Sequence, residues 1–132
     1  MNLVRIDNNE TGETFLSDHE WELEAGSFTP PSPAGYFTTS QMPSDCILMM
    51  HHPVGYEDDW HIAPAPVLGT VLTGQVRIQT SDMDTRTLQS GDQFLACDLM
   101  GKGHRMSEVN NGSYNLALVV LGTPPVTKPS SR

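Results

Sequence analysis

Two histidines stand far apart in the chain, each in a setting that suits chemistry. His61 begins an apolar run after the acidic segment 57–59, and His104 follows the glycines Gly101 and Gly103. An imidazole exchanges protons near neutral pH and is also a good ligand for transition metals. We expect folding to bring His61 and His104 together in a metal site, an acid–base site or a binding pocket.

Asp98 is the best candidate to join these histidines, because it ends the apolar segment that leads to the glycine turn before His104. A carboxylate there would set the tautomer of one imidazole and stabilise its charged form. Strand alternation places Phe94 and Ala96 on the same face as Asp98, which predicts an apolar pocket with one acid. We therefore take His61, Asp98 and His104 as the candidate catalytic residues. The alternative is that Asp98 only accepts backbone N–H bonds in the glycine turn.

Apolar and soft side chains are expected to hold the substrate. The predicted substrate contacts are Val67, Val71, Phe94, His51 and Met106. His51 and His52 are neighbours, so on a strand at most one of them enters the cavity. Cys97 has no partner base nearby in the sequence and alternates away from Asp98, so we do not expect it to be a nucleophile.

Short β-strands must position these residues. The regular segments are 60–63, 67–73, 75–80, 85–88, 93–98, 104–109 and 114–121, and turn residues separate them. No segment keeps a helical apolar repeat over three turns. The pattern predicts an all-β sandwich or small barrel.

The flanking segments complete the expected organisation. Residues 3–6 predict an edge strand, 45–54 a buried strand, and the proline-rich stretch 28–35 an extended surface connector. Asn111-Gly112 is the strongest hairpin signal. We expect an N-terminal arm with its connector over 1–44, a barrel over 45–122, and a surface or disordered tail over 123–132.

Composition excludes several classes of partner. The chain has 132 residues, 37% of them hydrophobic, which suffices for one packed domain. The formal net charge of −9 argues against nucleic acid and anionic membranes as partners. Two cysteines without CxxC spacing, and an N-terminus without a secretory signal pattern, lead us to expect a reduced, cytoplasmic protein.

Residues 45 to 121 resemble a small single-domain cupin. Cupins carry two motifs, G(X)5HXH(X)3–4E(X)6G and G(X)5PXG(X)2H(X)3N. Gly55, His61 and Gly74 match the first motif; Gly91 matches the second, as does His104 if two extra residues precede it. The resemblance implies a double-stranded β-helix, or jelly-roll barrel, whose cavity holds both motifs. It also leads us to expect a homodimer, with the arm before residue 30 as a candidate exchange element.

The chain departs from the cupin pattern at the metal-ligand positions. Ala63 replaces the second histidine of the first motif, and Val67 or Leu68 replaces its glutamate. Of the four usual ligand positions, His61 and His104 remain. Small apolar replacements of this kind remove metal ligands and add apolar surface to the pocket wall, as expected for a site that binds an organic molecule.

Three functions are compatible with this pattern. The leading interpretation is a non-redox lyase, isomerase or cyclase that moves protons on a small hydrophobic or aromatic metabolite. The second is a metal-dependent oxygenase in which His61, Asp98 and His104 form a two-histidine, one-carboxylate site for zinc, iron or manganese. The third is a non-catalytic ligand-binding protein. The sequence leaves open whether the cofactor is a divalent metal or absent.

Overall fold

The computed structural model describes residues 1–26 and 34–130, and all regular structure in these residues is β. No helix long and apolar enough to cross a membrane occurs among them. The strands are β1 (Asn2–Asn8), β2 (Thr14–Trp21), β3 (Glu24–Ala25), β4 (Phe37–Thr38), β5 (Ser44–His52), β6 (Val67–Thr73), β7 (Gln75–Thr80), β8 (Thr85–Gln89), β9 (Gln93–Ala96), β10 (His104–Glu108), β11 (Tyr114–Leu121) and β12 (Thr127–Pro129).

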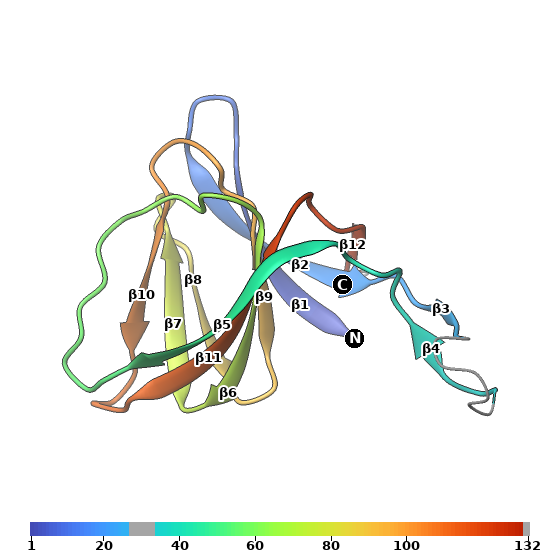
Figure 1. Ribbon diagram of the computed structural model, residues 1–132. Helices are drawn as coiled ribbons and strands as arrows, with labels where there is room; N and C mark the ends of the chain where they lie inside the picture. Colours follow the sequence, from blue (N-terminus) through green and yellow to red (C-terminus); the bar gives the residue numbers. More distant parts are fainter. Residues whose placement is uncertain (27–33, 131–132) are drawn as a thin grey trace.

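The strands form three sheets. The largest has the order β12-β2-β1-β9-β6-β11-β5, the second has the order β10-β7-β8, and β3 pairs with β4 in a short hairpin. Figure 1 shows the β10-β7-β8 sheet on one side of the large sheet, with the β3–β4 hairpin projecting away from both. The all-β class predicted from the short alternating segments is therefore confirmed.

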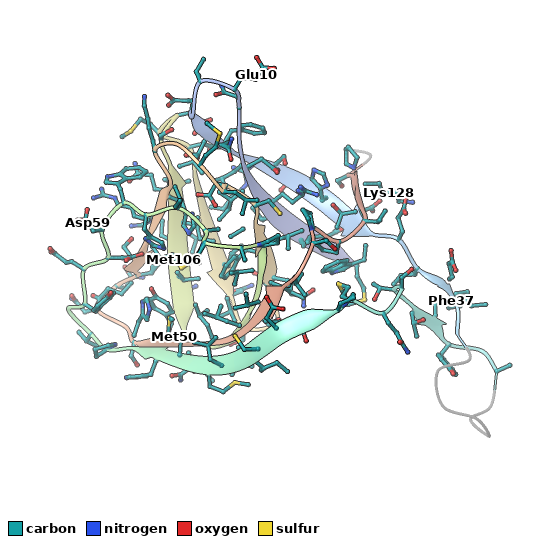
Figure 2. All side chains as sticks on the ribbon, turned by 45° about the horizontal axis from the view of Figure 1, so that its top comes forward. Glu10, Phe37, Met50, Asp59, Met106 and Lys128 are labelled. Carbon is teal, nitrogen blue, oxygen red and sulfur yellow. The ribbon has the colours of Figure 1, made fainter. Side chains whose placement is uncertain are left out.

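The main core lies between the two larger sheets, and Figure 2 shows side chains filling this space. Val71, Phe94 and Leu116 from the large sheet pack in one cluster with Ile78 and Met106 from the three-stranded sheet. Alternation explains this arrangement, because every second residue of a strand faces the opposite sheet. A second, smaller cluster lies on the outer face of the large sheet and consists of Leu3, Trp21, Leu95, Cys97 and Leu121.

The central strands agree closely with the sequence pattern. The segments 67–73, 75–80 and 114–121 are strands with the expected limits, and 85–88, 93–98 and 104–109 are strands that differ by one or two residues at their ends. Residues 60–63 are an exception, because they form an isolated β-bridge between His61 and His104 instead of a strand. The prolines at 64 and 66 follow this segment directly and lack the backbone donors that a continued ladder would need.

Two predictions for the outer parts of the sheet are wrong, and the tail, expected on the surface or disordered, lies on the surface as an ordered strand over 127–129. β1 is an interior strand, since it pairs with β2 on one side and runs parallel to β9 on the other. β5 is an edge strand, and its outward side chains Ile47 and Met49 are 64% and 66% exposed. The tail contains β12, which pairs with β2 and adds a strand to the far edge of the sheet.

The asparagine turn forms, but it does not join a hairpin. Asn110 and Asn111 both have positive φ, and the Gly112 N–H donates to the Val109 carbonyl at 3.1 Å. These angles are typical of a tight primed turn. The strands on either side, β10 and β11, nevertheless belong to different sheets. The predicted proline-rich connector lies, for residues 27–33, outside the described residues.

Candidate functional site

His104 and Asp98 form a buried pair at the start of β10. The His104 Nδ1 atom lies 2.6 Å from Asp98 Oδ2, and the residues are 3% and 0% exposed. Because the carboxylate oxygen accepts, Nδ1 carries a proton, and in the neutral ring Nε2 is the nitrogen with the lone pair. The expected role of Asp98 in setting an imidazole tautomer is therefore present in the geometry.

The carboxylate of Asp98 is held behind the His104 ring and does not line the cavity wall. Its second oxygen, Oδ1, is buried and has no hydrogen-bond partner among the described residues. The alternative role for Asp98, an acceptor of backbone N–H groups in the glycine turn, is absent from the hydrogen bonds described for this side chain. His104 thus supplies the hydrogen bond that compensates for burial of the acid.

A glycine brings the two motif histidines together. Gly103 has a φ of +76°, and a Cβ there would lie 2.2 Å from the carbonyl oxygen of His61. Its absence lets the His61 N–H donate to the His104 carbonyl at 3.0 Å, and the His104 N–H donate back at 2.9 Å. The ring centroids are 4.6 Å apart. The predicted meeting of His61 and His104 is confirmed.

His61 is the solvent-facing member of this cluster. Its Nδ1 donates to the carbonyl oxygen of Asp59 at 2.7 Å and lies 3.5 Å from Asp58 Oδ2, and the side chain is 47% exposed. Asp58 also accepts a hydrogen bond from the backbone N–H of Met106 at 3.1 Å. His61 therefore lies in ring contact with the buried His104 and is itself open to solvent.

A cavity of about 310 Å³ opens beside these histidines. Its polar lining residues are His52, Tyr56, Asp58, His61 and His104. The apolar lining residues are Met50, Ile62, Ala63, Pro64, Val67, Phe94, Ala96, Met106, Leu116, Leu118 and Val120. A mostly apolar wall with a few convergent polar groups is typical of a small-molecule site.

The predicted substrate contacts divide into two groups. Val67, Phe94 and Met106 line the cavity. Val71 is not part of the cavity wall, although it belongs to the same core cluster as Phe94. His51 is not part of it either, because β5 directs it outward, where its Nδ1 lies 2.7 Å from Asn115 Oδ1. These last two assignments are corrected.

His52 takes the place that we had assigned to His51. Its Nδ1 accepts a short hydrogen bond from the Tyr114 hydroxyl, and its Nε2 lies 3.0 Å from Met50 Sδ. Burial lowers the pKa of His52 and raises that of Tyr114, so both are neutral near pH 7. Alternation predicted that at most one of the two histidines faces inward, and the β5–β11 register decides that it is His52.

The residues fit a three-ligand metal centre poorly. Among residues 1–26 and 34–130, no three His, Cys, Asp or Glu side chains form a group that could hold a metal ion. Asp98 Oδ2 is directed at His104 Nδ1, so the two do not offer free donors to one ion. Ala63 and Val67 form part of the apolar wall. Of the expected metal set, His104 and Asp98 form a hydrogen-bonded pair, and His61 joins His104 through backbone hydrogen bonds and a ring contact.

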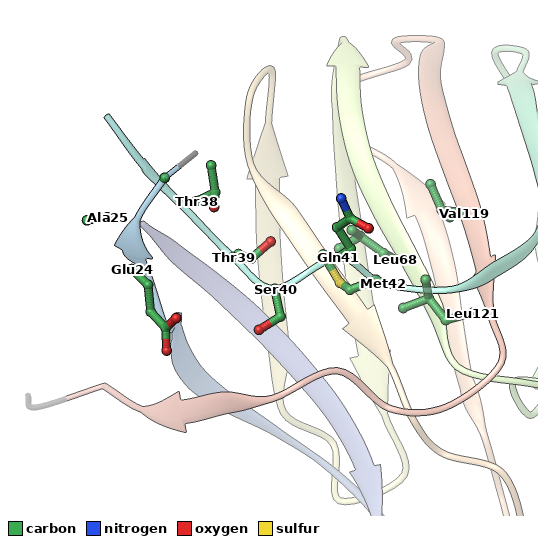
Figure 3. Close-up of a pocket in the computed structure, with 11 residues that line it drawn as sticks. Glu24, Ala25, Thr38, Thr39, Ser40, Gln41, Met42, Leu68, Val119 and Leu121 are labelled. Atoms are coloured by element: carbon green, nitrogen blue, oxygen red, sulfur yellow. The ribbon is translucent and has the colours of Figure 1, made fainter. Parts of the chain in front are cut away.

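A larger hollow lies on the opposite face of the large sheet. This outer groove measures about 620 Å³ and is lined by Glu24, Ala25, Gly26, Thr38, Thr39, Ser40, Gln41, Met42, Leu68, Val119 and Leu121. Figure 3 shows Thr39, Ser40 and Gln41 on the segment that crosses this face. Glu24 is its one titratable lining group among the described residues. The smaller inner cavity is therefore the better candidate site.

Cys97 does not contribute a nucleophile to the inner cavity. It is buried in the outer core cluster, and burial raises its pKa to about 11. The thiolate is the reactive form, so the thiol is inert near neutral pH. A scan of protein-family models found no match to this chain, and a search of curated proteins found none either.

Proposed function

We propose that this protein is a small-molecule enzyme that catalyses a non-redox proton transfer, as a lyase, isomerase or cyclase, on a hydrophobic or aromatic metabolite. The observation that carries the proposal is the buried His104–Asp98 pair, at 2.6 Å, beside an otherwise apolar cavity. An imidazole whose tautomer is held by a buried carboxylate is suited to general acid–base work.

The proposal includes a cupin double-stranded β-helix with a depleted metal motif. Its support is the all-β architecture, together with the meeting of His61 and His104 across the β-bridge that joins the two matching segments. The protein is further proposed to be a cytoplasmic homodimer. The exposed side chains of Ile47 and Met49 on the edge strand β5 are compatible with a second copy there. Light scattering on the purified chain measures that oligomeric state.

In the proposed reaction, Nε2 of His104 removes a proton from the substrate. The imidazolium that forms is stabilised by Asp98, whose Oδ2 already accepts from Nδ1. His61, half exposed and 4.6 Å away between ring centroids, exchanges the proton with solvent or returns it to another atom of the substrate. General acid–base catalysis of this kind contributes about 10²–10⁴-fold to a rate.

The cavity limits the size of the substrate. Its volume of about 310 Å³ is at the small end of ligand pockets, which suits a molecule of one or two rings. Phe94, Leu118 and Val67 offer apolar surface to the body of such a molecule. Among the described residues, the wall has no cationic side chain other than its histidines, so a strongly anionic substrate would lack a counter-charge.

Deuterium incorporation from heavy water tests the proposal. Phenylacetone and phenylacetonitrile both fit the size limit and carry acidic C–H bonds; NMR follows their loss of protons. We expect exchange to be catalysed by the wild-type protein and lost in His104→Ala, with His51→Ala as the matched surface control. No catalysed exchange of either compound, combined with ligand-induced thermal stabilisation, would favour a binding protein instead.

Metal quantification of the same preparation separates the oxygenase alternative. The proposal expects proton exchange to survive treatment with a chelator. A stoichiometric iron, zinc or manganese ion that disappears in His104→Ala, together with loss of exchange on chelation, contradicts it.

A further inference from the structure

A second polar pair, His52 and Tyr114, presents one member to the cavity, since His52 lines it. His104 lies on β10 of the three-stranded sheet, whereas His52 lies on β5 of the large sheet. Tyr114 is the direct cross-strand partner of His52 in the β5–β11 ladder, and its hydroxyl bonds His52 Nδ1. Nothing in the proposed proton transfer uses this pair.

The contacts of His52 determine its tautomer. Tyr114 is 1% exposed, and burial raises its pKa, so the hydroxyl stays protonated. It therefore donates a hydrogen bond to Nδ1 of His52. The other ring nitrogen, Nε2, lies 3.0 Å from Met50 Sδ, and a thioether only accepts. Both contacts require the proton of the neutral ring to be on Nε2.

The Nε2–H group of His52 is poorly satisfied. Sulfur in a thioether is a weak acceptor, so this contact offsets only a small part of the free-energy cost of burying the N–H group. Met50 and His52 both line the cavity, and a ligand oxygen that displaces the flexible Met50 side chain would form a much stronger bond. The site thus offers a neutral donor to an oxygen that gains negative charge.

We propose that His52, held as its Nε2–H tautomer by Tyr114, donates a hydrogen bond to the carbonyl oxygen of the substrate, which assigns the substrate to small apolar ketones and aldehydes with an acidic α-C–H bond. The inference rests on the proposed function of the same cavity. A neutral imidazole in this role stabilises the developing enolate without surrendering its own proton.

The step balances without an added reagent. Nε2 of His104 takes the α-proton, and the C–H electron pair becomes a C=C bond. The carbonyl π pair moves to oxygen, giving an enolate that accepts from Nε2–H of His52. The enolate then takes a proton back at carbon in an isomerisation or exchange, or expels a β-leaving group in an elimination, while the imidazolium beside Asp98 supplies the proton.

The tautomer is measured first, without any ligand. Nitrogen-15 NMR of histidine-labelled protein at pH 7.5 is expected to show a neutral His52 ring with its proton on Nε2. Tyr114→Phe removes the donor to Nδ1 and should give a mixture of tautomers. A wild-type ring protonated on Nδ1, or on both nitrogens, overturns the proposal.

The second test uses phenylacetone labelled with carbon-13 at its carbonyl. In the wild-type protein we expect the bound carbonyl signal to move downfield, as a polarised carbonyl does, and the shift to be lost in His52→Phe. Exchange of the α-protons should fall by about 10²–10³-fold in His52→Phe, the usual effect of removing one oxyanion donor. His52→Gln, which retains a side-chain N–H donor, should recover part of this loss, and His51→Phe should change nothing.

The outcomes separate this inference from the proposed function. Exchange that requires His104 but proceeds equally in His52→Phe overturns the role of His52 and leaves the proton transfer standing. A carbonyl shift that requires His52, without catalysed exchange, supports the carbonyl site and contradicts the enzyme. Phenylacetone that shows no carbonyl shift with the wild-type protein overturns the carbonyl assignment. If phenylacetonitrile still exchanges its acidic protons in a protein that gives no carbonyl shift, the proposed proton transfer by His104 stands.

Discussion

The inner cavity and the outer groove lie on opposite faces of the same sheet, yet they differ in chemistry. The outer groove is twice as large, at about 620 against 310 Å³, but hydroxyl, amide and aliphatic side chains supply most of its lining. The inner cavity gathers three histidines, two of them fixed by a buried carboxylate or phenol. Histidines that converge on one cavity, with hydrogen bonds that fix their tautomers, therefore indicate a catalytic site better than the volume of the cavity does.

The largest expected contrast is in catalysis. Asp98→Asn replaces the carboxylate that accepts from His104 Nδ1 by an amide that can donate to it. The ring proton would then move to Nε2, the nitrogen that must be free to accept the proton of the substrate. We expect deuterium exchange into phenylacetone to fall by about 10⁴-fold, the effect of the equivalent change in serine-protease triads. Glu24→Gln in the outer groove is the control and should leave the rate unchanged. Equal losses in both variants would contradict the assignment of the site.

The next contrast is in stability. Phe94 is 1% exposed and lies in the core beside the cavity, so Phe94→Ala should lower the free energy of unfolding by about 3–5 kcal/mol. Met42 is half-buried over the outer core cluster, and Met42→Ala should cost only about 1 kcal/mol. Urea denaturation of the two variants measures both. A larger loss for Met42 would show that the outer cluster, and not the inner one, dominates the fold.

Cysteine labelling tests whether the outer core stays closed. Cys46 is exposed on β5, whereas Cys97 is buried with a pKa of about 11. At pH 8 only about one Cys97 in a thousand would be a thiolate even if reagent reached it. Iodoacetamide should therefore modify Cys46 and spare Cys97, as read by peptide mass spectrometry. Comparable modification of both residues in the native protein would contradict the packing around Cys97.

The smallest expected effect is on the pH dependence of stability. Burial lowers the pKa of His52 below its ordinary value of 6.5; nearby Asp58 raises it in part, and His51 and His61 lower it. Between the folded and unfolded pKa values of His52, the unfolded chain binds more protons than the folded one, so the free energy of unfolding rises with pH. The contribution of His52 to that free energy is therefore complete above pH 6.5 and is lost as pH falls. His52→Phe should flatten this part of the stability curve. His19, whose pKa burial also lowers, keeps a slope of the same sign in the variant.

The neighbouring residue, His51, again provides the control for the pH experiment. His51→Phe leaves His52 in place, so urea midpoints measured from pH 7.5 downward should keep the wild-type slope. A wild-type slope in His52→Phe, or a flattened one in His51→Phe, would mean that the inward and outward histidines of β5 have been exchanged.

The sequence predicted the inner site better than the outer layer. Alternation along segment 93–98 placed Phe94 and Ala96 on one cavity-facing side, and both line the cavity. The outer strands β1 and β5 were misjudged because they owe their positions to partners far away in the chain. The apolar run in β5 was read as buried, although edge exposure depends on sheet order and not on local composition.

The sequence alone predicted the all-β class and the approximate limits of most central strands, and it singled out His61, Asp98 and His104 as candidates. These follow from local chemistry, because alternation, turn residues and the glycine at 103 act over a few residues. Only the tertiary structure decided that Asp98 lies behind His104, that His52 and not His51 faces the cavity, and that Tyr114 bonds it. The placement of His52 and Tyr114 depends on the register between β5 and β11, which are distant in sequence, and a one-residue shift of register turns every side chain to the other face. The Asp98–His104 contact joins residues only six apart and depends on the path of the glycine turn between them.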